Sequence, residues 1–302
     1  ASGELDNGYT WSYSMELDPG ATNASGTTDT AETQDAQNDD TKLTMTTPYG
    51  TVGVFISEGG LDKEDGASQS VYARPTDIGD PSSGGGDNYT IDAYNNLQFH
   101  TPADLLPFGT SFKIAYAPDL HTYGSGDNDG AQIDKSATGM GRSATEYQVT
   151  MAPIDGLAMG ASYIEFDGSG IAKIAQKPES GSAFATYAYG PFSFGLSKAY
   201  KAPIAGNSDQ TSTTQVDYYD QTNYSVSYAV NDDLSLSYEM EEDKKILTHD
   251  SMANVKQESS AIQAAYTMGG MTLAISRGSY DNAGYVQDTD VNQTLFAVTM
   301  AF

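Results

Sequence analysis

Apolar and polar side chains alternate one by one in short segments along the whole chain. In the last segment, Phe296, Val298 and Met300 share one face of a predicted strand, while small residues such as Ala297 lie on the other. This follows because successive side chains of a β-strand point to opposite sides. The same alternation predicts fourteen strands, near 9–17, 41–47, 51–57, 91–101, 109–117, 143–152, 157–166, 182–189, 191–200, 217–230, 233–241, 257–268, 271–280 and 291–302.

Short turns and long loops alternate between these strands. The short turns, such as 47–50 and 153–156, carry the Pro, Gly, Asn or Asp residues that tight hairpins require. A transmembrane barrel puts its short turns at one rim and its long loops at the other, whereas a soluble two-sheet sandwich has no reason to do so. The pattern therefore favours an all-β, antiparallel transmembrane β-barrel over a sandwich. The long polar loops are expected near 18–40, 58–90, 118–142, 167–181, 201–216, 242–256 and 281–290.

The first residues affect the strand count. The stretch Leu5-Asp6-Asn7-Gly8 is a strong hairpin signal, and a hairpin needs a strand on each side. Only residues 1–4 precede this turn, so we expect the first strand and most of the second strand of the barrel to be missing from the sequence. Adding two strands gives sixteen in the intact protein, in a single domain that includes all of 1–302. A fourteen-stranded barrel with a frayed start is the alternative.

The composition narrows the class of protein. The 302 residues include 14 Lys and Arg against 41 Asp and Glu, a net charge of −27, which argues against nucleic acid as a partner because phosphate binding needs basic clusters. There is no cysteine, so disulfides and thiolate metal sites are excluded. Only 38% of the residues are hydrophobic, and no apolar run approaches the ~18 residues of a membrane helix. A barrel tolerates this composition, because it needs only every second strand residue to be apolar.

This layout, the terminal Phe302 and the long loop 58–90 together resemble the general diffusion porins of the Gram-negative outer membrane, over essentially the whole chain. The resemblance implies a water-filled channel for passive diffusion of small hydrophilic solutes. It also implies a homotrimer in a lipid bilayer with lipopolysaccharide, in which the acidic loop 18–40 lies near the threefold axis or contacts a neighbouring subunit. If two strands precede Ala1, loop 58–90 is the long third loop, which in this family folds into the pore and constricts it.

Loop 58–90 and the strands facing it supply the candidate pore-lining residues. We expect the apolar side chains of the loop to pack on the inner wall and its carboxylates to face the passage. The apolar ones are Leu61, Val71, Tyr72 and Ile78. The predicted constriction residues are Asp62, Glu64, Asp65, Arg74, Asp77, Asp80 and Asp87 of the loop, with Lys42, His100 and Lys113 of the wall. Acids opposite bases set up a transverse field that disfavours apolar solutes. The alternative is a disordered acidic surface loop and solvated lysines without a special role.

Acidic residues outnumber basic ones along this passage. The alternation also turns Glu16, Glu146, Glu239 and Glu241 inward. Like charges along a confined aqueous path concentrate counter-ions, so we expect a moderate cation preference that is strongest in dilute salt. A weak anion preference is the alternative, if the few bases cluster at the narrowest point while the acids lie far out on the loops.

Other chemistry is only weakly indicated. Asp77, Asp80 and Asp87 form a candidate calcium site, because carboxylate oxygens on a Gly-rich loop suit that ion, with a solvated loop as the alternative. The three histidines show no metal-ligand spacing, and no Ser-His-Asp set can be proposed, so we expect no enzyme activity. The second functional hypothesis is an outer-membrane receptor or adhesion barrel with a closed lumen, whose acidic loops bind a partner.

Overall fold

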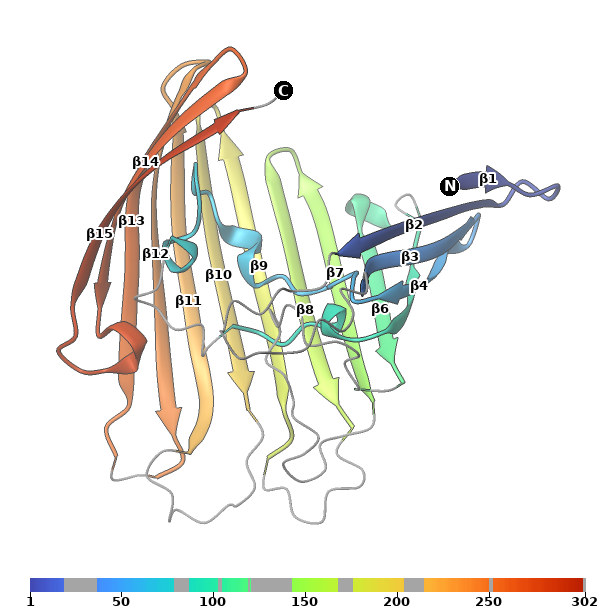
Figure 1. The fold of residues 1–302 in the computed structure, drawn as a ribbon, viewed down its shortest axis with the longest axis horizontal. Helices are drawn as coiled ribbons and strands as arrows, with labels where there is room; N and C mark the ends of the chain where they lie inside the picture. The colour runs from blue at the N-terminus through green and yellow to red at the C-terminus, as the bar shows by residue number, and fades with distance from the viewer. Residues whose placement is uncertain are drawn as a thin grey trace, which may run out of the picture. The chain divides into compact units, whose positions relative to one another are not determined.

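The computed structural model describes residues 1–18, 37–78, 87–102, 105–118, 120, 143–167, 176–203, 215–249 and 252–300. Within these residues, the chain is all-β, and fifteen strands form one sheet in which every strand pairs with its neighbours in sequence. Figure 1 shows β9 to β15 as long strands running side by side. Every strand pair with an assigned register is antiparallel, as a chain of hairpins requires.

The strands are β1 (Ser2–Glu4), β2 (Thr10–Asp18), β3 (Gln37–Thr47), β4 (Gly50–Ile56), β5 (Asn96–His100), β6 (Ser111–Ala117), β7 (Ala144–Ile154), β8 (Leu157–Phe166), β9 (Glu179–Tyr189), β10 (Phe192–Ala202), β11 (Val216–Ala229), β12 (Leu234–Leu247), β13 (Val255–Met268), β14 (Met271–Asp281) and β15 (Val291–Met300). Short 3₁₀ helices lie in the connections: η1 (Glu64–Ala67), η2 (Pro75–Asp77), η3 (Ile91–Ala93), η4 (Pro107–Gly109) and η6 (Ala283–Tyr285). No helix in this described part of the chain has the length and apolar character needed to cross a membrane.

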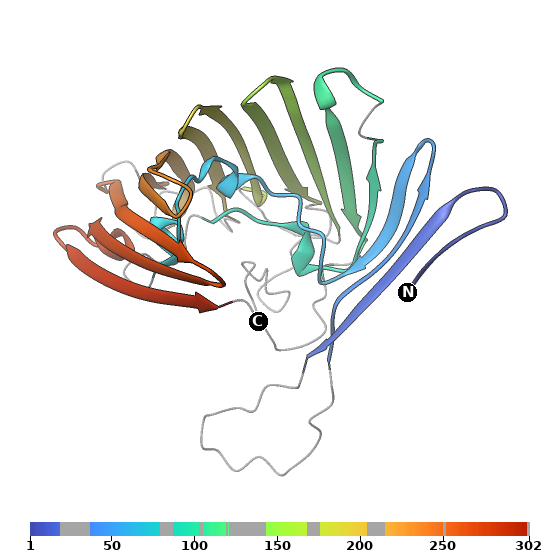
Figure 2. The ribbon, with the colours of Figure 1, turned by 90° about the horizontal axis from the view of Figure 1, so that it is seen from above.

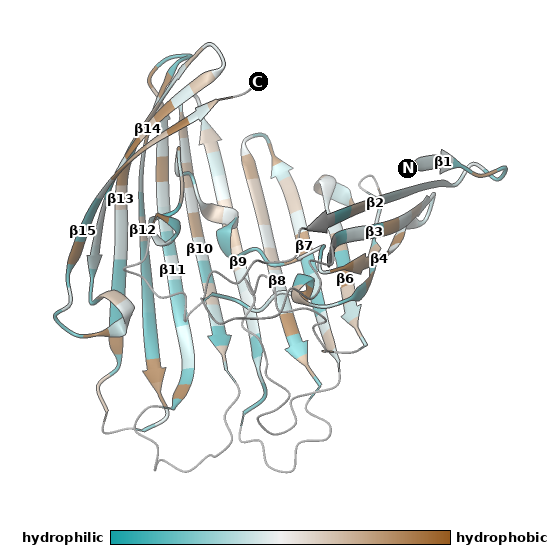
Figure 3. Cartoon of the chain, viewed as in Figure 1, coloured by the Kyte–Doolittle hydropathy of each residue, from teal (hydrophilic) through white to brown (hydrophobic). Residues whose placement is uncertain are grey.

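The two faces of the strands differ in character. On β10, Phe194 and Leu196 are exposed, whereas Ser197 and Ala199 on the opposite face are buried. We call the face with exposed apolar side chains the outer face and the opposite one the inner face; Figure 3 shows the resulting alternation of brown and teal along the strands. Large apolar side chains exposed over a whole face suit lipid rather than water.

The closing strand confirms the alternation predicted from its sequence. Phe296, Val298 and Met300 are exposed on the outer face of β15, with Phe296 at 75% of its full exposure. On β5, the predicted inward residues Asn96 and Gln98 are buried. Phe302 lies outside the described residues.

The described residues divide into two compact units. The first unit comprises 1–61, 89–149 and 164–172. An apolar cluster on its inner face holds residues 89–94 against β6, β7 and β8; its members are Leu61, Tyr89, Ile91, Tyr94, Ala115, Ala117, Leu120, Ala144, Ile164 and Phe166. The ring of Phe166 meets the ring of Tyr89 edge-on, with centroids 5.1 Å apart.

The second unit comprises 62–88, 150–163 and 173–302. Figure 2 shows β9 to β15 as a curved sheet with the light-blue segment 62–78 on its concave side. The segment approaches the sheet closely, because a Cβ added to Gly195 of β10 would lie 1.8 Å from the Ala67 carbonyl oxygen. Only glycine therefore fits at this position of the inner face.

Two details of the predicted strands are wrong, and the strand count changes by one. Ser2–Glu4 pairs with β2, in the register Gly3↔Trp11, which confirms the hairpin predicted at 5–8 and adds a fifteenth strand to the fourteen predicted. The strand predicted at 91–101 is limited to β5, because residues 91–93 form η3 and pack into the apolar cluster. The loop predicted at 242–256 is shorter, because β12 and β13 continue into it and stay paired as far as Lys245↔Val255.

Candidate functional site

Residues 58–78, which we call the inner segment, follow the inner face and contact one strand after another. Backbone groups of the segment bind side chains of the wall, which shows that the loop folds inward at least as far as Ile78. The contacts are Lys63 N to Ser162 Oγ (2.9 Å), Ser225 Oγ to Ala67 O (2.5 Å), Val71 N to Ser237 Oγ (3.0 Å), Tyr72 N to Gln263 Oε1 (3.0 Å), Tyr280 Oη to Pro75 O (2.8 Å) and Gln293 Nε2 to Ile78 O (3.1 Å).

Three glutamates on the inner face accept hydrogen bonds from the inner segment or from residue 91. Glu146 of β7 accepts from the backbone N–H groups of Ile91 (2.9 Å) and Leu61 (3.4 Å) in the first unit. Glu239 of β12 accepts from the hydroxyls of Ser68 (2.7 Å) and Ser70 (2.6 Å) in the second. The third, Glu241, is described below with Arg74. Because Glu146 and Glu239 are almost fully buried, these bonds satisfy carboxylates that would otherwise be costly to bury.

Asp62 ties the start of the inner segment to β8 and β9. Its Oδ1 accepts from Ser162 Oγ (3.0 Å), Ser182 Oγ (3.2 Å) and Asn88 Nδ2 (3.0 Å). Its Oδ2 accepts from the backbone N–H of Glu64 (2.8 Å). The carboxylate therefore joins both ends of the loop to the wall, and it does not simply face the passage as predicted.

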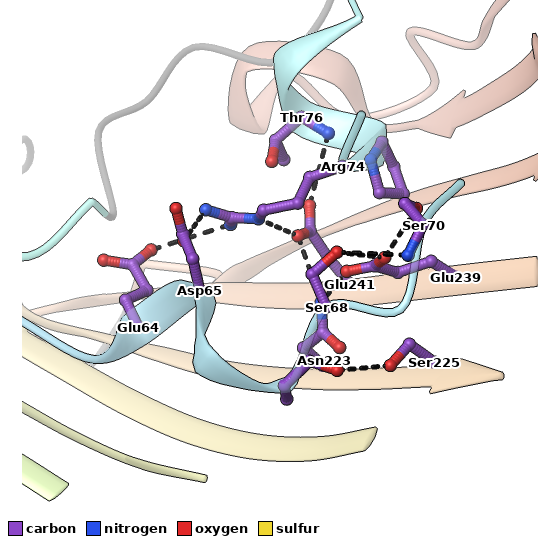
Figure 4. A network of polar contacts seen from close by, with 12 residues as sticks. Glu64, Asp65, Ser68, Ser70, Arg74, Thr76, Asn223, Ser225, Glu239 and Glu241 are labelled. Carbon is purple, nitrogen blue, oxygen red and sulfur yellow. Dashed lines mark hydrogen bonds and ion pairs between the residues drawn. The ribbon is translucent and has the colours of Figure 1, made fainter. Parts of the chain in front are cut away.

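Arg74 joins two elements of the second unit, β12 and η1 (Figure 4). Its Nε donates to Glu241 Oε1 of β12 at 2.7 Å, and one terminal nitrogen pairs with Asp65 of η1. The other terminal nitrogen lies 3.8 Å from Glu64 Oε1. Glu241 also accepts from Asn223 Nδ2 (3.1 Å) and from the backbone N–H of Thr76 (3.3 Å). The guanidinium, with its side chain only 15% exposed, is thus shared by carboxylates of the wall and of the loop.

Burial changes the titration of this network. Burial raises the pKa of Glu64 to about 8; the Arg74 guanidinium opposes this rise, and Asp62 and Asp87 add to it. Desolvation dominates because the contact to Arg74 is too long for a hydrogen bond and Glu64 Oε1 has no hydrogen-bond partner. Burial alone would lower the pKa of Arg74, but Glu241 and Glu64 outweigh it and raise that pKa.

A cavity of about 30 Å³ in the second unit is lined by Arg74 and by residues of the wall. Five carboxylates reach it, and its lining residues are Glu64, Arg74, Thr76, Asp87, Ser197, Ala199, Gln221, Thr222, Asn223, Glu241, Glu242, Asp243 and Gln257. This volume holds one or two water molecules. The acidic lining makes this part of the inner face strongly negative.

The predicted wall residues lie in the first unit. Lys42 pairs with Glu58, the first residue of the inner segment. Lys113 lies directly opposite His100 in the register of β5 and β6, and His100 Nε2 is 2.7 Å from Gln98 Oε1. All three therefore lie on inner-face positions, as the alternation predicted.

The remaining loop residues give a mixed outcome. Leu61 and Ile78 are buried against the wall as predicted, but Tyr72 is 41% exposed, because its backbone rather than its ring is held by Gln263. Asp65 is exposed apart from its pairing with Arg74, and Asp77 and Asp87 are exposed. Asp80 and most of loop 18–40 lie outside the described residues, so the calcium site at Asp77, Asp80 and Asp87 stays a prediction. Among the described residues, no group of three or more His, Cys, Asp or Glu is arranged to hold a metal ion.

Several wall residues of the site were not predicted individually. Asn223 and Ser225 flank the exposed Tyr224 and are buried on the opposite face. The alternation of β11 could therefore have predicted that both side chains lie on the inner face. Gln263 binds the backbone of both Tyr72 and Ala73, with 2.5 Å from its Nε2 to Ala73 O. No sequence signal identifies these partners, because the contacts depend on the path of a loop without a repeating pattern.

Comparisons with known proteins agree with this architecture. No family model matches the sequence, and no curated protein matches it. Among solved structures, OmpF of Salmonella typhi, in a complex with daunomycin, has a TM-score of 0.63 and 14% identity, over 99% of this chain and 87% of that one. A triple mutant of Rhodopseudomonas blastica porin has a TM-score of 0.53 and 14% identity, over 99% and 88%. OmpT, an outer membrane protein of Vibrio cholerae, has a TM-score of 0.53 and 13% identity, over 98% and 84%.

At these identities the likeness concerns the fold alone. The chain has the fold of outer-membrane β-barrel proteins, porins among them. What those proteins transport, bind or assemble with does not follow from this likeness.

Proposed function

We propose that the chain forms a water-filled channel in the outer membrane of a Gram-negative bacterium, through which small hydrophilic solutes and ions diffuse passively with a moderate preference for cations. The observation that carries this proposal is the contrast between the two faces of the sheet. The outer face exposes large apolar side chains, and the inner face is polar, acidic and partly covered by the inner segment. A channel wall in a membrane needs this combination.

The cation preference rests on the surplus of acids. The described residues of loop 58–90 carry six acids against two bases, Lys63 and Arg74; the acids are Glu58, Asp62, Glu64, Asp65, Asp77 and Asp87. Arg74 is already paired with carboxylates, and Lys42 is paired with Glu58, so these bases add little net positive field. In this proposal the protein has no enzyme activity, and lipid, lipopolysaccharide and two further copies of the chain surround it. Calcium at Asp77, Asp80 and Asp87 remains a secondary element of the proposal.

Recordings from planar lipid bilayers test the proposal. The refolded protein is expected to give stable ohmic conductance steps. In a KCl gradient, the reversal potential is expected to show potassium favoured over chloride, with the preference fading as salt rises because screening shortens the reach of the fixed charges. Repeated insertions without conductance would contradict the channel and favour the receptor barrel. Steps that favour chloride would contradict the acidic field while leaving the channel itself intact.

A further inference from the structure

The inner segment is held by two kinds of contact. Most are neutral hydrogen bonds, such as Val71 N to Ser237 Oγ and Tyr280 Oη to Pro75 O. The Arg74 contacts are different, because both partners are charged and one side chain joins two separate elements, whereas Glu146 and Glu239 accept from neutral donors of the segment. Charge-assisted bonds are roughly twice as strong as neutral ones, and a guanidinium holds its partners in a fixed geometry.

Glu241 is the wall partner of Arg74, and within the described part of the chain Arg74 is the one cationic side chain that pairs with it. Glu241 is 7% exposed, and its remaining donors are the neutral Asn223 Nδ2 and Thr76 N–H. Removing the guanidinium therefore leaves a buried carboxylate without its counter-charge. Breaking one side of a buried ion pair is strongly destabilising, and water or movement of the loop is the ordinary relief.

We propose that Arg74 is the positioning residue of the inner segment: by joining Glu241 of β12 to Asp65 of η1, it fixes the segment on the inner face and keeps the ion path at one width. This inference rests on the proposed channel function. Arg74 acts through the loop, and its own charge is largely cancelled by its partners. Its loss is therefore expected to disturb the steadiness of the current more than its selectivity.

Single-channel recordings of Arg74→Met test the inference. Compared with the natural protein, the variant is expected to visit additional conductance levels about ten times more often or more, because the loop loses its bridge. Arg74→Lys keeps the charge but not the forked geometry, and is expected to restore steadiness only in part. Arg277→Met is the matched control: Arg277 is exposed on the outer face of β14 and binds Thr294, so its loss is expected to leave the recordings unchanged.

Two further variants separate positioning from a general loss of stability. Arg74→Met combined with Glu241→Gln leaves no unpaired buried charge, so it is expected to fold normally and still to fluctuate. The exchange Arg74→Glu with Glu241→Arg rebuilds the contact to β12 but places a carboxylate beside Asp65 and Glu64, so it is expected to leave the recordings unsteady. Steady currents from the double variant with Gln would overturn the inference.

A tether provides an independent readout. The chain has no cysteine, so Val71→Cys with Ser237→Cys places one thiol pair where the segment meets β12. In the Arg74→Met background, linking the two thiols with a short bifunctional reagent is expected to suppress the additional levels. Fluctuations that persist after complete cross-linking would overturn the role of the loop. A natural protein that is silent in the bilayer would instead refute the channel, whereas steady Arg74→Met channels would refute only the role of Arg74.

Discussion

The cation preference is expected to increase with pH because of Glu64. With its pKa raised to about 8, Glu64 is only about one-tenth ionised at pH 7 and about nine-tenths ionised at pH 9. Each ionised Glu64 adds one negative charge to an inner face that Arg74 already fails to neutralise. Glu64→Gln keeps the shape of the neutral acid and removes this titration.

The magnitude follows from Coulomb's law. A unit charge about 5 Å from an ion in water-like surroundings is worth about 0.8 kcal/mol, and about 0.5 kcal/mol after screening at ~0.1 M salt. This raises the occupancy of a cation about twofold and lowers that of an anion by the same factor, since RT is about 0.6 kcal/mol. The permeability ratio of potassium to chloride is therefore expected to rise by up to about fivefold between pH 6 and pH 9.

Reversal potentials in a dilute KCl gradient at pH 6, 7, 8 and 9 measure this ratio. Glu64→Gln is expected to flatten the rise near pH 8, and the difference between the two proteins isolates the contribution of Glu64. Asp155→Asn, in the short turn between β7 and β8, removes the same charge elsewhere and is expected to keep the rise. A natural protein with a flat profile, or a Glu64→Gln profile that still rises, would refute the assignment of this step to Glu64.

The remaining predictions concern stability and the inner segment. The pKa of Glu64 is about 8 in the folded protein against an ordinary 4.5, so the unfolded chain loses this proton at lower pH than the folded one. The free energy of unfolding is therefore expected to fall as pH rises from about 4.5 to 8, by at most roughly 5 kcal/mol. Denaturant titrations of Glu64→Gln and the natural protein measure this fall. Gly195→Ala places a Cβ 1.8 Å from Ala67 O and is expected to displace the inner segment and make the current unsteady. Gly181→Ala is the milder control, because its added Cβ lies 3.1 Å from the nearest atom. Equal recordings from the two variants would contradict the close approach of the segment to Gly195. Ile262→Arg, at a position 66% exposed on the outer face, is expected to cost about 2–4 kcal/mol in folding into liposomes, and Asp233→Arg in a short turn far less; tolerance of both would argue against a lipid-facing surface.

The fold was predictable because its signal is repeated. Alternation with period 2 appears in nearly every strand, so a local irregularity does not change the overall assignment. The signal fails where packing or charge overrides it: residues 91–93 look like the start of a strand but form η3 under the apolar cluster. Residues 241–245 of β12 are all charged and have no apolar face, yet they stay paired with β13 as far as Lys245.

The candidate site was predictable only by face. Alternation turned Glu239 and Glu241 inward, and both contact the inner segment. It could not show that Arg74 would be buried among carboxylates, because the inner segment has no period and its path depends on many partners at once. Tyr72 illustrates the same limit, since a large aromatic in this loop was expected on the wall and lies exposed instead.

The choice of acid over amide on the inner face links the two roles of the site. Gln263 shows that a neutral amide can anchor the segment, because it binds the backbone of Tyr72 and Ala73 by itself. Glu239 binds Ser68, Ser70 and Asn223, which are neutral donors, and no ion pair to Glu239 occurs among the described residues. Both oxygens of Glu239 are used, Oε2 by the two serines and Oε1 by Asn223, and a glutamine would present an N–H donor to one of these donors. The carboxylate at this position therefore serves anchoring directly, and in the proposed channel the same acidic residue also adds to the cation-attracting inner face.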